Sequence, residues 1–250
     1  MNSIQMNKFK TVLSYFLAIL TILLFVLFII YRQDSSFSFE PFYPYSNLIL
    51  EGILNTILVS FIALVGSMIL GFILYILQIS KIKYFNALVD VFTEIIYGTP
   101  LLVLIIIMAF LIGPAFNSYR RDLFGVIALV IYMSPYMKNV YKSAFSSISK
   151  EQFLAMDLFL FTPYQRYRYI IIPQVTRILM PTLMNNFSMI IKGSALLNLL
   201  SFAELYYVIN VAQSKTFAFV EGYLLMWALY LMLTIPLSQL TKYVERRFAL

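Results

Sequence analysis

Long uncharged apolar stretches constrain this chain more than any other feature. Residues 11–31 and 52–80 contain no charged side chain. A helix needs about 20 such residues to cross a bilayer, whereas a membrane barrel strand alternates apolar and polar positions. Because backbone N–H and C=O groups in lipid must form hydrogen bonds with one another, these stretches predict an all-α membrane protein.

Four more apolar stretches, at about 95–113, 122–141, 178–205 and 220–241, bring the expected number of transmembrane helices to about six. The first stretch has a longer apolar core than a signal peptide, and YRQDSS follows it instead of a small-residue cleavage site, so we expect an uncleaved anchor. Residues 32–50 form a polar and aromatic loop.

Charge sets the expected orientation. Lys and Arg gather near the N-terminus, after the second and fourth spans and at the C-terminus, which predicts both termini in the cytoplasm. These positive charges fall in short loops between spans, which argues against a nucleic-acid partner. The chain has no Cys and no His, which excludes disulfides, thiol chemistry and His-based metal sites or proton relays.

The polar segment 143–176 lies on the cytoplasmic side in this topology. Within it we expect two short helices, 152–161 and 164–172, with Thr162 and Pro163 at the start of the second. Phe153, Met156 and Phe159 have helical spacing and could form one apolar ridge. Such a ridge fits either a groove on a partner or the lipid headgroup layer.

Polar residues inside the spans are candidates for a transport path. Lys192 is expected near mid-membrane, where a charge needs a cavity or a partner. It either lines the path or forms a structural ion pair or a bond to a carbonyl. Glu204 lies near the outer end of its span, with a structural or a path-lining role. Asn185 and Asn186 either bond between helices or line a pore.

Thr99 and Pro100 interrupt the third stretch. Proline near a helix start is sterically tolerated, and Gly98-Thr99 suits a cap, so a helix start at the cytoplasmic interface is one interpretation. A role in gating or shaping a pore is the other.

Several motifs together resemble ABC-importer permeases of the polar amino acid type. Lys150–Gln174 resembles their cytoplasmic EAA loop, with Leu154 at the Glu position, Ala155 and Met156 at the two Ala positions, Leu160 at the Gly position, and Ile170-Ile171-Ile172-Pro173 as the closing element. The motif from Glu94 to Leu102 resembles Glu-x-x-Arg-Gly-Thr-Pro-Leu-Leu, with Tyr97 for Arg. Lys192 to Leu196 resembles Lys-Asp-Thr-Ser-Leu, with Gly193 for Asp, and Ala203-Glu204-Leu205 resembles Pro-Glu-Leu.

The resemblance covers roughly residues 48–249 and implies a five-helix permease core with an extra N-terminal helix. It divides the chain into 1–47, an anchor with an outward loop, and 48–250, the permease domain with the coupling loop. Because Leu160 replaces Gly, we expect the bend of that loop to have moved to Thr162-Pro163.

The resemblance also implies partners and site residues. Two permease subunits would form the pore in membrane lipid, two ATPase subunits would bind below, and an extracellular substrate-binding protein would deliver an amino acid or a related polar solute. This chain would need no cofactor and catalyse nothing, since it has no Gly-Lys-Ser/Thr phosphate loop. The losses at 154, 160 and 193 favour a different chain as the second permease.

The expected ATPase contacts are Lys150, Gln152, Phe153, Leu154, Ala155, Met156, Phe159, Leu160 and Pro173. The expected path or gating residues are Thr99, Pro100, Asn185, Lys192, Ser194 and Glu204.

Two other classes of function stay open at this point. A secondary transporter or channel would work without an ATPase, but it needs intramembrane carboxylates or His for ion coupling, and this chain has few. A membrane scaffold with no transport role would tolerate the lost Glu and Gly. Co-purification of an ATPase subunit separates these alternatives.

Overall fold

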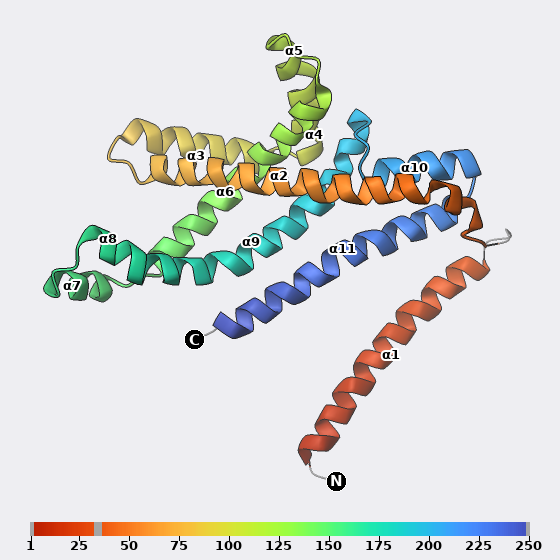
Figure 1. Cartoon of the computed structure of the whole chain (residues 1–250), viewed down its shortest axis with the longest axis horizontal. Helices are drawn as coiled ribbons and strands as arrows, with labels where there is room; N and C mark the ends of the chain where they lie inside the picture. The colour runs from red at the N-terminus through yellow and green to blue at the C-terminus, as the bar shows by residue number, and fades with distance from the viewer. Residues whose placement is uncertain (1–2, 33–36, 249–250) are drawn as a thin grey trace.

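The computed structural model describes residues 3–32 and 37–248, and every regular element in these ranges is helical (Figure 1). The elements are α1 (Ser3–Tyr31), η1 (Glu40–Tyr45), α2 (Ser46–Gln78), α3 (Lys83–Gly98), α4 (Leu101–Ile107), η2 (Met108–Ile112), α5 (Gly113–Ala115), α6 (Arg121–Ser146), α7 (Lys150–Leu158), α8 (Pro163–Gln165), η3 (Arg166–Ile171), α9 (Ile172–Ser194), η4 (Ala195–Leu200), α10 (Leu205–Thr216) and α11 (Phe219–Phe248).

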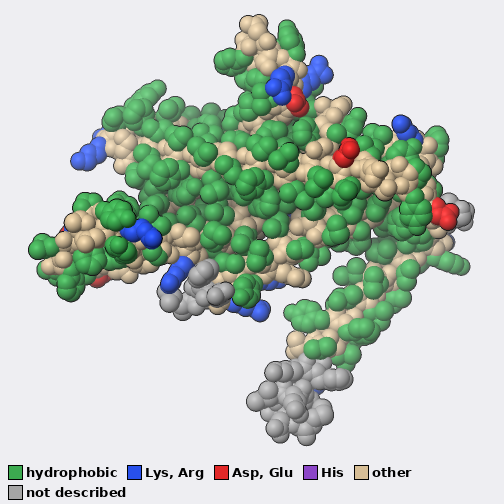
Figure 2. Space-filling model, in the orientation of Figure 1, with side chains coloured by type: hydrophobic (Ala, Val, Ile, Leu, Met, Phe, Trp, Pro, Cys, Tyr) green, Lys and Arg blue, Asp and Glu red, His purple; other side chains and the backbone are tan. Residues whose placement is uncertain are grey.

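Helix length and hydropathy confirm the expected membrane architecture. Among the described residues, four helices are long and apolar enough to cross a bilayer, or up to six if each of two bent helix pairs counts as one span. Hydrophobic side chains cover most of the face of the bundle shown in Figure 2. The prediction of an all-α membrane protein with about six spans is therefore confirmed.

The third span is sharply bent. Helix α3 meets the helical run Leu101–Ala115, which begins with α4, at 109°, with Thr99 and Pro100 extended between them. Proline disfavours a helical residue before it and cannot donate a backbone hydrogen bond, which breaks the run. Helix α4 begins directly after Pro100, as expected. The hydroxyl of Thr99, however, donates to the carbonyl of Ile95 at 2.6 Å, so it caps the end of α3 and not the start of α4.

Helix α2 is the central element of the bundle, and α6 crosses it closely (Figure 1). A stripe of small residues on α2 makes the close crossing possible, because small side chains let two backbones approach. At Gly71, a Cβ atom would lie 2.5 Å from the Cβ of Met137 and 2.8 Å from the carbonyl oxygen of Ser134. The buried stripe consists of Gly52, Thr56, Ser60, Ala63, Ser67 and Gly71. Its first two residues pack against the start of α10 instead of α6.

The N-terminal helix α1 stands away from the bundle (Figure 1), and no residue of its membrane-spanning window is buried. Residues 37–47 behave differently. Phe42 is buried against Leu205, Val208 and Met226 in the core at one end of the bundle. We expected residues 1–47 to form one unit, but the part of it from residue 37 onward packs with the core.

Candidate coupling loop and polar groove

The candidate coupling loop begins with a capped helix. The hydroxyl of Ser149 accepts a hydrogen bond from the backbone N–H of Gln152 at 3.3 Å, which fixes the start of α7 at Lys150. A hydrogen bond from its own backbone N–H, and a second one with the Ser149 side chain, hold the pKa of Glu151 below its usual value. Lys150 and Glu151 in this first turn are both exposed.

The loop turns at Leu160. This residue has a φ of 52°, in the left-handed region that leucine rarely adopts. The N–H of Phe161 donates to the carbonyl of Met156, and the N–H of Leu160 donates to that of Asp157, both at 3.0 Å. This is the hydrogen-bond pattern of a Schellman motif, in which the left-handed position is usually glycine. The expectation that the bend had moved to Thr162-Pro163 is therefore wrong: it stays at position 160.

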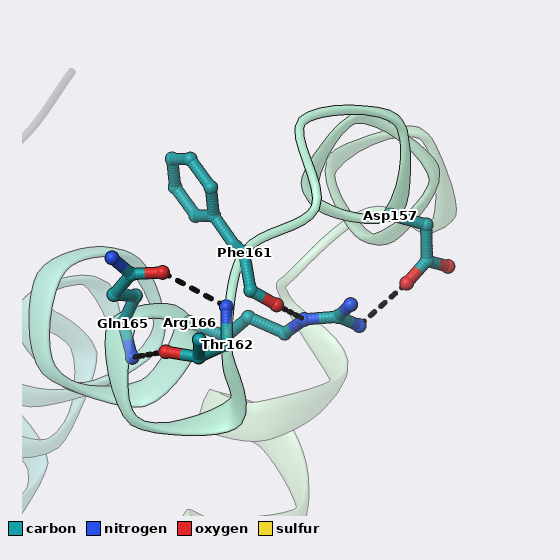
Figure 3. A network of polar contacts seen from close by, with 5 residues as sticks. All are labelled: Asp157, Phe161, Thr162, Gln165 and Arg166. Carbon is teal, nitrogen blue, oxygen red and sulfur yellow. Dashed lines mark hydrogen bonds and ion pairs between the residues drawn. The ribbon is translucent and has the colours of Figure 1, made fainter.

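A network of polar contacts secures the chain after the turn (Figure 3). Thr162 and Gln165 form a capping box: the backbone N–H of Thr162 donates to the Gln165 side chain at 2.9 Å, and that of Gln165 donates to the Thr162 hydroxyl at 3.3 Å. Arg166 donates from Nε to the carbonyl of Phe161 at 2.8 Å and forms an ion pair with Asp157 at 2.6 Å. Arg166 thus ties the end of α7 to the start of α8.

The second arm of the loop is not a separate helix. Helices α8 and α9 join through η3, a π-helical turn, so the chain stays helical through Pro173. Pro173 is accommodated without a break, because a π turn shifts the bonding register ahead of a proline that cannot donate. Movement of the loop can therefore be transmitted directly to α9.

The expected apolar ridge of Phe153, Met156 and Phe159 is not a single exposed surface. Met156 is only 2% exposed and packs with Ile148 and Ile171. This packing holds the loop against the bundle. Its neighbours face outward instead: Leu154 is 62%, Leu158 83%, Phe159 75% and Leu160 86% exposed. We call these four side chains the docking knob. Phe153 is partly exposed beside it, and Ala155 lies half-buried.

A polar groove of about 540 Å³ runs between α9 and α11. On α9 one helical face lines it with Pro181, Asn185, Ser188 and Lys192, and on α11 one face lines it with Thr234, Ser238, Thr241 and Glu245; each set follows the spacing i, i+4, i+7 and i+11. Thr182, Ile235 and Lys242 complete the lining, so the groove holds a second lysine besides Lys192. Sequence reasoning missed the α11 half, although its polar residues recur at helical spacing through an apolar stretch.

The groove contains two of the six expected path residues. Asn185 and Lys192 line it and are exposed to it. Neither the expected ion pair nor a carbonyl bond forms at Lys192, whose ammonium group has no hydrogen-bond or charge partner within residues 3–32 and 37–248. Asn186, the residue after Asn185, is buried, and its side-chain amide donates to the sulfur of Met137 on α6.

The other expected path residues do not line this groove. Ser194 is buried and its hydroxyl donates to the carbonyl of Ile191. Glu204 is buried and structural: its carboxylate accepts from the backbone N–H groups of Tyr206 and Tyr207 and from the hydroxyl of Tyr230 at 2.8 Å. It caps α10 and ties α10 to α11. Thr99 and Pro100 form the α3–α4 bend described above.

The bent helices, the helix–turn–helix loop and the polar groove form a membrane bundle of the kind found in transport permeases. The chain belongs to the family of binding-protein-dependent transport system inner membrane components, whose model matches residues 67–250. This membership makes it a multi-pass membrane protein and the permease component of an ABC importer. It supports the permease interpretation over the secondary transporter and the scaffold.

Individual relatives agree with the family. The chain is 33% identical to the probable glutamine ABC transporter permease protein GlnM of Bacillus subtilis (strain 168), over 86% of this chain and 98% of the relative. It is 28% identical to the glutamine transport system permease protein GlnP of Escherichia coli (strain K12), over 84% and 97%.

Solved structures share the fold. An amino acid ABC transporter crystallised with histidines has a chain that matches with a TM-score of 0.77 and 27% identity, over 85% of this chain and 100% of that one. An inward-facing structure of the MetNI methionine ABC transporter matches with a TM-score of 0.61 at 15% identity, over 81% and 98%, which shows the fold alone. The family implies ATPase, substrate-binding and second permease partners.

Proposed function

We propose that this chain forms part of the pore of an importer for amino acids or related small polar solutes. The observation that carries the proposal is the polar groove between α9 and α11, into which Lys192 faces without a partner. An unpaired ammonium group in the last turn of α9 suits a carboxylate, which every amino acid carries. The relatives named for glutamine support this substrate class.

The groove offers no carboxylate next to Lys192 for the ammonium group of an amino acid. Its one acidic residue, Glu245, lies eleven residues along the α11 face from Thr234, toward the other end of the groove. Gly193 stands where the resembling motif has Asp. We therefore infer that the second permease subunit supplies the acidic contact and is a different polypeptide. A native complex containing a single permease polypeptide would contradict this inference.

Coupling to ATP is assigned to the loop from Lys150 to Pro173. Two ATPase subunits would hydrolyse ATP in the cytoplasm and would contact α7 at Lys150, Gln152, Phe153 and the docking knob. The continuous path from α8 through η3 into α9 would carry their movement to the groove. The pore would then switch between two states whose balance the ATPase controls. Both termini lie in the cytoplasm in this arrangement.

The test is transport by a Lys192→Gln variant. The full transporter, reconstituted in liposomes with ATP and its binding protein, should take up radiolabelled glutamine about tenfold more slowly or worse, because a charged hydrogen bond to the carboxylate is lost. Lys142→Gln is the matched control, since Lys142 is an exposed lysine outside the groove. Unchanged uptake by Lys192→Gln, with a normal ATPase content, would exclude this groove as the path.

A further inference from the structure

The docking knob consists of four exposed apolar side chains outside every candidate membrane span of the described residues. It lies with α7 at the end of the bundle where α2 ends and α3 begins (Figure 1), and Lys81 and Lys83 mark that end as cytoplasmic. Hydrophobic side chains are visible over this tip in Figure 2.

Three charged residues of α7 lie near the knob. Asp157, which lies between knob residues Leu154 and Leu158 in the sequence, forms an ion pair with Arg166 at 2.6 Å. Lys150 and Glu151 lie in the first turn of α7, one helical turn before Leu154 and two before Leu158. Leu154 and Leu160 stand where the resembling loop has Glu and Gly, so this chain has lost one charge there and gained two large apolar side chains.

The backbone supports this presentation. The left-handed conformation of Leu160 reverses the chain directly after α7, while Met156 anchors the inner face of the helix and Arg166 closes the turn. The four apolar side chains are therefore held on one exposed end of a fixed structure. Contiguous apolar surface of this kind marks a protein interface when water would otherwise cover it.

We propose that the knob is selective for an ATPase subunit whose docking groove is apolar and uncharged. The proposal rests on the assignment of this loop as the ATPase contact and adds the chemistry of the partner surface. A groove with a buried cation would leave that charge unpaired against Leu154, which is strongly unfavourable. An apolar groove gains from burying all four side chains.

The test measures binding of the ATPase subunit that co-purifies with the tagged full-length chain from its native host. Leu154→Glu and Leu158→Glu should each weaken binding about tenfold or more, because each buries an unpaired charge. Leu158→Gln should weaken it less, and Leu154→Met should bind like the natural chain. Tyr84→Glu, which adds the same charge at an exposed cytoplasmic position outside the knob, should have no effect.

Two outcomes separate this proposal from the one on which it rests. If Leu154→Glu binds the ATPase as tightly as the natural chain or more tightly, the groove is not apolar and the selectivity proposal fails, while docking stands. If replacing all four knob residues with serine leaves binding unchanged, the loop is not the ATPase contact and both proposals fail. Either reading requires correct insertion of the variant.

Lipid is the competing occupant of the knob. A Leu158→Trp variant in a Trp227→Phe background places the single tryptophan of the chain on the knob. In the complete transporter in nanodiscs, spin-labelled lipids should leave its fluorescence unquenched. Strong quenching would place the knob in the headgroup layer and overturn the proposal.

Discussion

Leu160 shows how one residue can occupy a conformation that its type disfavours. A left-handed leucine costs roughly 1–2 kcal/mol relative to a right-handed one. Around it, the two Schellman hydrogen bonds, the Thr162–Gln165 capping box and the Arg166 contacts all form. These contacts offset the backbone cost and keep the bend in place after the loss of glycine.

Leu160→Gly should therefore stabilise the turn, because glycine adopts this conformation freely. We expect the free energy of local opening to rise by about 1 kcal/mol. Leu160→Ala is the matched control: it removes the same side chain but keeps the strained backbone. Hydrogen exchange of the Phe161 amide, measured on the purified chain, reports the opening. Equal protection in the two variants would show that the backbone conformation stores no strain.

Residue exposure within the loop was the hardest property to predict from sequence. Phe153, Met156 and Phe159 share the same apolar character and helical spacing, yet Met156 alone is buried. The spacing fixes which residues share a face, but the direction of that face depends on contacts with residues such as Ile148 and Ile171. For the same reason Glu204 could not be assigned as a cap before its partner Tyr230 was placed next to it.

At the scale of elements, the spans were predictable because lipid demands long apolar helices. The stretches at 11–31 and 52–80 fall within α1 and largely within α2. Pro100 predicted a helix start but not the 109° bend, whose size depends on how α4 packs against α6. The continuity of α8 with α9 was unpredictable, since it requires a π turn that has no clear sequence signal.

Close packing of α2 on α6 leads to a prediction at the same scale. Gly71→Ala should destabilise the bundle by roughly 1–3 kcal/mol, since the new methyl group would meet the Met137 side chain and the Ser134 backbone. Gly98→Ala is the matched control, because nothing lies within 4 Å of a Cβ at that position. Thermal unfolding of both variants in the same detergent measures the difference. Equal melting temperatures would show that α2 and α6 can separate at no cost.

The whole molecule consists of a packed bundle and one helix outside it. Helix α1 buries no residue of its spanning window, so the bundle does not depend on it for packing. Residues 37–47 belong to the bundle, because Phe42 enters its core and the N–H of Ser38 donates to the Glu221 carboxylate at 3.3 Å. Two truncations that differ by 15 residues should therefore behave differently.

Deletion of residues 1–32 should leave a protein that inserts, folds and still co-purifies with the ATPase, since the coupling loop and the core are intact. Deletion of residues 1–47 removes Phe42 as well and should lower stability by about 3–5 kcal/mol, the usual effect of losing a buried phenylalanine. Because the chain has no cysteine, Tyr119→Cys and Ser147→Cys report orientation by labelling from outside and from inside, respectively. Loss of the ATPase from a correctly labelled 1–32 deletion would mean that α1 takes part in assembly and that the bundle is not the complete functional unit.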